Sequence, residues 1–281
     1  MWHDESAMAD KQSSGWRHWL DVLARRLHGR RTDDAPPHLR KPFIRRGWRY
    51  TSLQFTAGEA QSRMLTRRPD VLLIDYTRTM MAALLWQPRP RRVGMVGLGG
   101  GSQAKFCYRH LPEARIEVVE INPHVVALRR EFRIPDDDAR FVVVLDDGAR
   151  FVAARPGRYD LLLVDGYDET GIPEALSSQR FYDDCRDALA DGGVAAFNLY
   201  GDDVERHLDR LRRSFGERLL VVGERAMSNR VAFGWRGDPL PAPPFGLPTL
   251  LGRLPVGVRA ELMPVFERVG AALLAQTAQQ R

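Results

Sequence analysis

The chain has 281 residues, 44% of them hydrophobic, which is enough for one substantial core plus a small accessory element and indicates a globular protein. No apolar run is long enough to cross a bilayer and the first residues lack the features of a secretory signal, so we expect a soluble, cytoplasmic protein without a membrane partner. The formal net charge is +6, and the only two cysteines, Cys107 and Cys185, do not favour a disulfide framework.

Residues 1–40 are predicted to form a basic tail that carries one amphipathic helix. Apolar residues recur at helical spacing between Trp16 and Leu27, whereas the rest of the tail is polar and contains prolines. Arginines cluster from Arg17 to Arg49, and a charge run of this kind can serve as a contact arm. Nucleic acid or another anionic partner is therefore a secondary hypothesis, although no aromatic-rich nucleic-acid module accompanies the arginines.

Residues 41–75 are predicted to form a small antiparallel β element. The residues at 49–55 alternate and are β-prone, and a second β-prone run follows at 71–74. We expect both segments to be strands.

Residues 76–237 are predicted to form a Rossmann-like α/β domain, with a mostly parallel twisted sheet flanked by helices. Apolar runs bounded by turn residues predict its strands at 93–96, 115–121, 141–145, 159–164 and 194–199, with a final pair within 219–235. Helices are expected at 76–86, 103–111 and 178–190.

Residues 238–281 are predicted to form a Pro-rich linker and a C-terminal helix. The linker contains four prolines between Pro239 and Pro244, and the helix is expected from about Val256 to Gln279. One face of this helix is apolar, so it must be covered by the domain or by a second subunit.

The first four strands of the domain each end in glycine or an acid. Carboxyl ends of parallel strands lie at one edge of a sheet, so these residues are expected to meet in a ligand site. A Gly-rich turn before a helix lets backbone N–H groups approach a ligand, and a carboxylate at the next strand end can accept hydrogen bonds from ribose hydroxyls. Each acid taken singly could instead cap the following helix. The residues are Gly97, Gly99 and Gly101, then Glu120, then Asp147 and Gly148, then Asp165 and Asp168.

The spacing of the glycines separates two classes of nucleotide. A dinucleotide fingerprint would place its third glycine at Ser102, where this chain has none. Gly97, Gly99 and Gly101 fit better the turn of folds that bind S-adenosylmethionine-type nucleosides, so the predicted fold is of the S-adenosylmethionine-methyltransferase type. NAD is ranked below an adenosyl-sulfonium ligand.

From Leu53 to Leu199 the order and spacing of several short motifs resemble the spermidine synthases, or polyamine aminopropyltransferases. The order and spacing of the motifs together are more specific for this family than any single motif. They are Arg109-His110, Glu120-Ile121-Asn122, Asp147-Gly148, Asp165-Gly166-Tyr167-Asp168 with Gly171 and Glu174, and Phe181-Tyr182.

The resemblance implies decarboxylated S-adenosylmethionine as a co-substrate, with no tightly bound cofactor and no metal. Glu120 would bind the ribose, and Asp147 and Gly148 would lie at the adenine. Gln54 or Gln61 could contribute to the same pocket. The resemblance also implies a homodimer.

For the other substrate, the resemblance implies a small-molecule amine. Asp165 would accept its proton, because only a neutral amine can attack the sulfonium-activated carbon. Asp168 would help to hold the amine, and Tyr76 and Glu174 are further candidates for substrate binding. Additional negative charge could come from Glu169, Asp183 and Asp184.

Three departures from the family pattern concern the amine half of the site. Gly100 stands where the family has an aspartate that contacts the donor's amine, Tyr76-Thr77-Arg78 replaces Tyr-His-Glu, and the proline at Pro173 is displaced by one residue. Two alternatives therefore stay open. One is an S-adenosylmethionine-dependent methyltransferase, in which Arg78 would point at the donor's carboxylate. The other is a non-catalytic nucleoside-binding protein.

Overall fold

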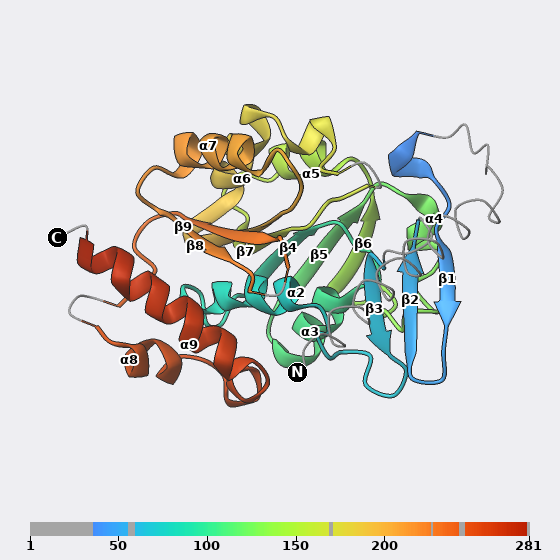
Figure 1. The fold of residues 1–281 in the computed structure, drawn as a ribbon, viewed down its shortest axis with the longest axis horizontal. Coiled ribbons are helices and arrows are strands. Elements are labelled where there is room, and N and C mark those ends of the chain that lie inside the picture. The colour runs from blue at the N-terminus through green and yellow to red at the C-terminus, as the bar shows by residue number, and fades with distance from the viewer. Residues whose placement is uncertain (1–35, 56–59, 169–170, 226, 242–244, 280–281) are drawn as a thin grey trace, which may run out of the picture.

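The computed structural model describes residues 36–55, 60–168, 171–225, 227–241 and 245–279. These residues form two sheets and the helices around them (Figure 1). The amphipathic helix predicted between Trp16 and Leu27 lies outside the described residues. Before the first strand there is a short 3-10 helix, η1 (Pro37–Leu39).

The small β element is antiparallel, as predicted, and it has three strands, of which only the one at 50–54 was predicted. Its strands are β1 (Phe43–Arg46), β2 (Tyr50–Gln54) and β3 (Ser62–Leu65), in the order β1-β2-β3.

The strand predicted at 71–74 is wrong. The N–H of Val71 donates to the carbonyl oxygen of Arg68 in a turn, and Leu72 is buried in the core. This short apolar run therefore reflects burial of a loop, which periodicity alone does not distinguish from a strand.

The large sheet has seven strands in the order β6-β5-β4-β7-β8-β10-β9. The pairs β6-β5, β5-β4, β4-β7 and β7-β8 are parallel, and β10 lies antiparallel between β8 and β9. The predicted Rossmann-like class is confirmed. The strands are β4 (Arg92–Val96), β5 (Arg115–Glu120), β6 (Phe141–Leu145), β7 (Tyr159–Val164), β8 (Leu189–Leu199), β9 (Leu219–Gly223) and β10 (Arg230–Trp235).

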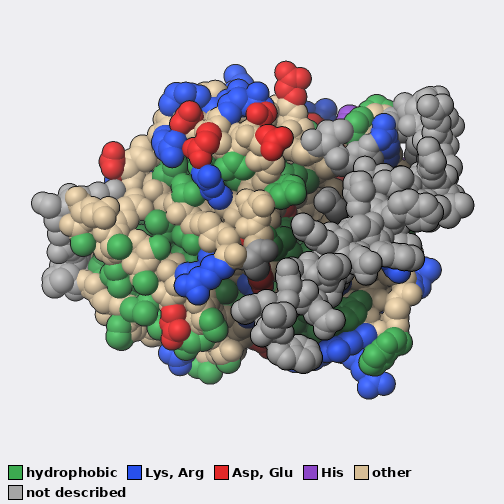
Figure 2. All heavy atoms as spheres, viewed as in Figure 1, with side chains coloured by type: hydrophobic (Ala, Val, Ile, Leu, Met, Phe, Trp, Pro, Cys, Tyr) green, Lys and Arg blue, Asp and Glu red, His purple; other side chains and the backbone are tan. Residues whose placement is uncertain are grey.

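Helices cover both faces of this sheet. One face carries α5 (Gly148–Ala153), α6 (Gln179–Ala188) and α7 (Val204–Phe215), and the other carries α2 (Asp75–Met80), α3 (Ser102–His110) and α9 (Val256–Gln279) (Figure 1). Over α6 and α7 the outer surface mixes acidic and basic side chains (Figure 2). The remaining short helices are η2 (Met81–Leu85), α4 (Pro123–Val126), η3 (Glu174–Leu176) and α8 (Leu247–Gly252).

The core consists of two clusters, one on each face of the sheet. Strand β7 shows why: Leu161 and Leu163 belong to the cluster under α2 and α9, whereas Leu162 and Val164 belong to the cluster under α5 to α7. Successive side chains of a strand point to opposite faces, so a continuous apolar run fills both cores.

The predicted C-terminal helix is confirmed with a bend. Leu262 has non-helical dihedral angles, two residues before Pro264, whose ring and missing N–H disrupt the helical ladder. The apolar face of α9, including Phe266 and Val269, is buried against this chain's own domain. Helix α8 was not predicted.

Candidate functional site

The Gly-rich turn between β4 and α3 is held against the loop that follows β7. Gly97, Gly99 and Gly101 all have positive φ angles, at +94°, +48° and +64°. A Cβ atom on Gly97 would lie 2.3 Å from the carbonyl oxygen of Asp165. Only glycine fits such an approach, so the predicted turn is also the contact between two strand ends.

Glu120, at the end of β5, is held by backbone amides. Its two carboxylate oxygens accept hydrogen bonds from the N–H of Leu98 at 2.9 Å and the N–H of Asn122 at 2.8 Å. Burial raises the pKa of Glu120, and hydrogen bonds from Asn122, Leu98, Gly99 and Ile121 oppose that rise. The carboxylate is thereby fixed beside the Gly-rich turn.

Asp165, at the end of β7, is held by two side chains from elsewhere in the sequence. The hydroxyl of Tyr76 on α2 donates to one carboxylate oxygen at 3.1 Å, and the amide of Asn198 on β8 donates to the other at 2.8 Å. Burial raises the pKa of Asp165, and both hydrogen bonds lower it. Burial also raises the pKa of Tyr76 well above its ordinary value, so this hydroxyl keeps its proton and remains a donor.

The structure thus brings Tyr76 and Asp165 together as sequence reasoning selected them, and it adds Asn198. The one signal for Asn198 in the sequence is a polar residue at the end of an apolar strand, Val194 to Leu199. Its side chain is buried. A buried amide needs a partner, so its position at the acidic edge of the sheet could have marked it.

Asp168 lies in the loop after β7, where it forms an isolated bridge with Gly171. Its carbonyl oxygen accepts a hydrogen bond of 3.4 Å from the side chain of Gln61, which directly precedes β3. The loop after β7 and the small sheet are therefore in contact, and Gln61 lies beside the Asp168 backbone.

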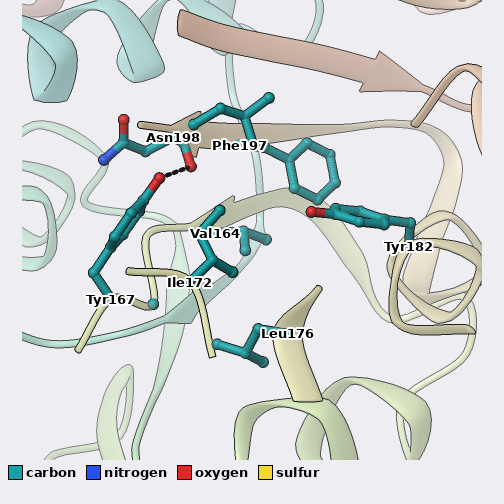
Figure 3. A pocket seen from close by; sticks show the side chains of 9 residues that line it. Val164, Tyr167, Ile172, Leu176, Tyr182, Phe197 and Asn198 are labelled. Carbon is teal, nitrogen blue, oxygen red and sulfur yellow. Dashed lines mark hydrogen bonds between the residues drawn. The ribbon is translucent and has the colours of Figure 1, made fainter. Parts of the chain in front are cut away.

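Next to this loop is a cavity of about 10 Å³, lined mainly by apolar side chains (Figure 3). Across it, the Tyr167 hydroxyl donates to the backbone carbonyl of Asn198 at 3.0 Å. A space of this size holds about one water molecule. It is too small for a nucleoside.

Asp147 and Gly148 occupy the start of α5. The Asp147 carboxylate accepts a hydrogen bond of 2.9 Å from the N–H of Arg150 and caps the helix. A Cβ on Gly148 would lie 2.7 Å from a methyl of Val96. Asp147 therefore caps the following helix, which is the structural role considered for each strand-end acid. Its contact with adenine stays a prediction.

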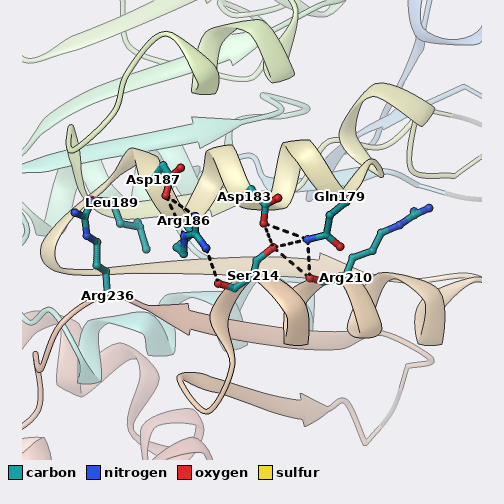
Figure 4. Close-up of polar contacts among 8 residues, drawn as sticks. All are labelled: Gln179, Asp183, Arg186, Asp187, Leu189, Arg210, Ser214 and Arg236. Carbon is teal, nitrogen blue, oxygen red and sulfur yellow. Dashed lines mark hydrogen bonds and ion pairs between the residues drawn. The ribbon is translucent and has the colours of Figure 1, made fainter.

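Three of the acids proposed as extra negative charge lie on η3 and α6. Glu174 is exposed at the start of η3. Asp183 accepts hydrogen bonds from Ser214 at 2.7 Å and Gln179 at 3.1 Å, between α6 and α7 (Figure 4). Asp184 pairs with Arg180 on the same helix. Glu169 lies outside the described residues.

Arg78 lies elsewhere too. It lines a surface pocket of about 340 Å³ together with Glu224 and Arg268, and neither Asp165 nor Glu120 lines that pocket. Tyr76 and Arg78 are two positions apart on α2, which places them on nearly opposite sides of the helix. The prediction that Arg78 points at the donor receives no support from this arrangement.

Gly100 is enclosed by the small sheet. A Cβ at this position would lie 2.4 Å from the hydroxyl oxygen of Ser62 on β3 and 3.0 Å from the ring of Phe132. Ser62 therefore fills the space that a side chain at position 100 would need.

Within the described part of the chain, no helix is long and apolar enough to cross a membrane, and no group of three or more His, Cys, Asp and Glu side chains could hold a metal ion.

Comparison with known proteins identifies the family of this chain. The family model described as "Spermine/spermidine synthase domain" matches residues 75–209. A polyamine aminopropyltransferase of Chromobacterium violaceum is 35% identical over 191 residues, which are 67% of this chain and 73% of that protein.

Solved structures show the same fold. A probable spermidine synthase from Corynebacterium glutamicum superposes with a TM-score of 0.62 at 19% identity, covering 79% of this chain and 83% of that one. Human methyltransferase-like protein 13, in complex with SAH, gives a TM-score of 0.57 at 24% identity, covering 69% and 93%. The fold is thus shared with methyltransferases, whereas the sequence match is with aminopropyltransferases. This chain belongs to the spermine/spermidine synthase family.

Proposed function

We propose that this protein is a transferase that moves an aminopropyl group from decarboxylated S-adenosylmethionine to an amine, in polyamine biosynthesis. The observation that carries the proposal is the position of Asp165. Its backbone carbonyl lies against the Gly-rich turn, and the two oxygens of its carboxylate accept hydrogen bonds from Tyr76 and Asn198. This is where a base is needed if the nucleoside lies over the turn.

In the proposed donor site, the glycines at 97, 99 and 101 let the backbone approach the nucleoside. Glu120 accepts hydrogen bonds from the ribose hydroxyls, and Asp147 and Gly148 lie at the adenine. The support for Glu120 is its fixed orientation by the N–H groups of Leu98 and Asn122. A carboxylate held in this way needs no reorganisation on binding.

In the proposed acceptor site, Asp165 takes a proton from the substrate ammonium group. The freed lone pair forms the new C–N bond as the C–S bond breaks, and the electron pair of that bond stays on sulfur as the neutral thioether methylthioadenosine. The proton then passes from Asp165 to solvent. Because the sulfonium is already a good leaving group, alignment of nitrogen, carbon and sulfur supplies much of the remaining rate.

Asp168 is proposed to hold the amine from the same loop, and Tyr76 is proposed to act on substrate through its hydrogen bond to Asp165. A direct contact of Glu174 with substrate stays a prediction. The homodimer and the cytoplasmic location also stay predictions.

A second candidate is methyl transfer from intact S-adenosylmethionine. The observation that favours it is the Ser62 hydroxyl beside Gly100, a neutral group where a carboxylate would repel the donor's own carboxylate.

The test compares Asp165→Asn with Asp183→Asn as a matched control, because Asp183 is bound between α6 and α7. Asp165→Asn should lower aminopropyl turnover by about two to four orders of magnitude, the usual range for a general base. Its nucleoside affinity should stay near that of the unmodified protein, and Asp183→Asn should keep its turnover. Equal turnover in the two variants would remove Asp165 from the mechanism.

A further inference from the structure

We infer that Asn229, between β9 and β10, is a positioning residue for Asp165 and acts through the amide of Asn198. The inference rests on the proposed function in one respect, that Asp165 is the proton acceptor. Asn229 belongs to no motif that the family resemblance selected.

The three side chains form a chain of hydrogen bonds. The amide nitrogen of Asn229 donates to the side-chain oxygen of Asn198 at 2.8 Å, and the amide nitrogen of Asn198 donates to Asp165 at 2.8 Å. Both asparagines are buried, with 5% and 6% of their surface exposed. A buried amide satisfied on both sides has one orientation, because exchanging its nitrogen and oxygen would break both bonds.

This orientation matters because a carboxylate can only accept. If the Asn198 amide were reversed, its carbonyl oxygen would face the Asp165 carboxylate, and the two would repel. Asn229 prevents the reversal by donating to the Asn198 oxygen. Tyr76 and Tyr167 also interact with Asp165, and burial raises the pKa of both tyrosines, so both are neutral near pH 7.

Asn229 is itself held in place by the connection between β9 and β10. Its carbonyl oxygen accepts from the N–H of Glu224 at 2.9 Å. Arg268 of α9 then fastens this connection from outside: it donates to the carbonyl of Gly223 at 2.8 Å and pairs with the Glu224 carboxylate at 3.2 Å. The C-terminal helix thus supports the far end of the hydrogen-bond chain.

The test uses Asn229→Asp, which keeps the shape of the side chain but removes its donor. An ionised aspartate at 229 would accept from Asn198, so the amide would turn its oxygen toward Asp165. Ser228→Asp is the control for an added charge at an exposed position, and Asn229→Ala removes the donor without adding a charge. The Asp165 carboxyl is titrated by ¹³C NMR, with its signal assigned by its loss in Asp165→Asn.

We expect the pKa of Asp165 to rise by about one unit or more in Asn229→Asp relative to Ser228→Asp, the usual scale for exchanging a hydrogen-bond donor for a repelling oxygen. The acidic limb of kcat/KM should move to higher pH by the same amount. An unchanged Asp165 pKa would overturn the inference. If Asn229→Asp does not fold, Asn229→Ala is titrated instead. We expect a smaller rise in the pKa of Asp165 in that variant, and an unchanged pKa would contradict the inference.

The titration also separates this inference from the proposed function. A raised pKa in a protein that transfers no aminopropyl group would support the positioning role and reject the reaction. Aminopropyl transfer by a protein in which Asn229→Asp leaves the pKa of Asp165 unchanged would support the reaction and reject the positioning role.

Discussion

The carboxylates of the donor half and the acceptor half of the site are held by different kinds of group. In the donor half, Glu120 is fixed by N–H groups of Leu98 and Asn122, which lie within 22 residues of it along the chain. In the acceptor half, Asp165 is fixed by side chains of Tyr76 and Asn198, which are 89 and 33 residues away. One half is held by backbone N–H groups, and the other by side chains from α2 and β8.

The two halves should respond differently when residues depart from the family pattern. Backbone amides are present whatever the side chains are, so the donor half can keep its geometry when individual residues change. The acceptor half depends on each named side chain, and the family departures at Gly100 and Arg78 leave Tyr76, Asn198 and Asp165 in place. The structure accommodates both, with Ser62 filling the space at Gly100 and Arg78 turned to a separate pocket.

The largest of the effects that would sharpen this comparison is expected for Glu120→Ala. Removing the carboxylate should weaken nucleoside binding by roughly 1 to 3 kcal/mol, because a charged hydrogen-bond partner is lost. Calorimetry with methylthioadenosine measures it, and Glu113→Ala, at an exposed position before β5, is the matched control. Equal affinity in the two variants would mean that the ribose is bound elsewhere.

The next effect concerns the contact between the Gly-rich turn and the small sheet. Gly100→Asp should lower the free energy of unfolding by about 1 to 3 kcal/mol, since the new side chain overlaps Ser62. Adding Ser62→Gly should recover part of that loss, whereas Gly252→Asp, which has open space around it, should cost less. Denaturant unfolding measures all four proteins. If the double variant is no more stable than Gly100→Asp, Ser62 is not the obstacle.

The smallest effect tests the acceptor half alone. Asp165 acts as a base only when ionised, so activity should fall as the pH drops through its pKa. Tyr76→Phe removes a donor that lowers this pKa, so the acidic limb of kcat/KM should move to higher pH by about one unit. Nucleoside affinity should not change.

Tyr108→Phe is the control for that variant, because Tyr108 donates to Asp138 at 2.7 Å in a similar pair outside the site. The same acidic limb in both variants would show that Tyr76 does not act on the base.

The features that depend on residues close together in the sequence were predicted well. Strands β6 and β7 lie at the predicted residues, because apolar runs bounded by Gly and Asp mark both their burial and their ends. The same signals located Glu120 and Asp165. The run at 71–74 failed as a strand because four apolar residues can pack without joining a ladder.

Asn198 and Asn229 could not be paired from the sequence. Their contact depends on the antiparallel register of β8 and β10, in which Val231 lies opposite Asn198. Nothing local specifies that register before the sheet forms. The turning away of Arg78 depends likewise on how α2 packs against α9.

The most direct test of the central claim is the identity of the product. The purified protein is given decarboxylated or intact S-adenosylmethionine, each with putrescine, cadaverine or spermidine, and the products are identified by mass spectrometry. The account predicts an aminopropylated amine and methylthioadenosine from the decarboxylated donor. A methylated product from the intact donor, with no aminopropyl transfer, would contradict it.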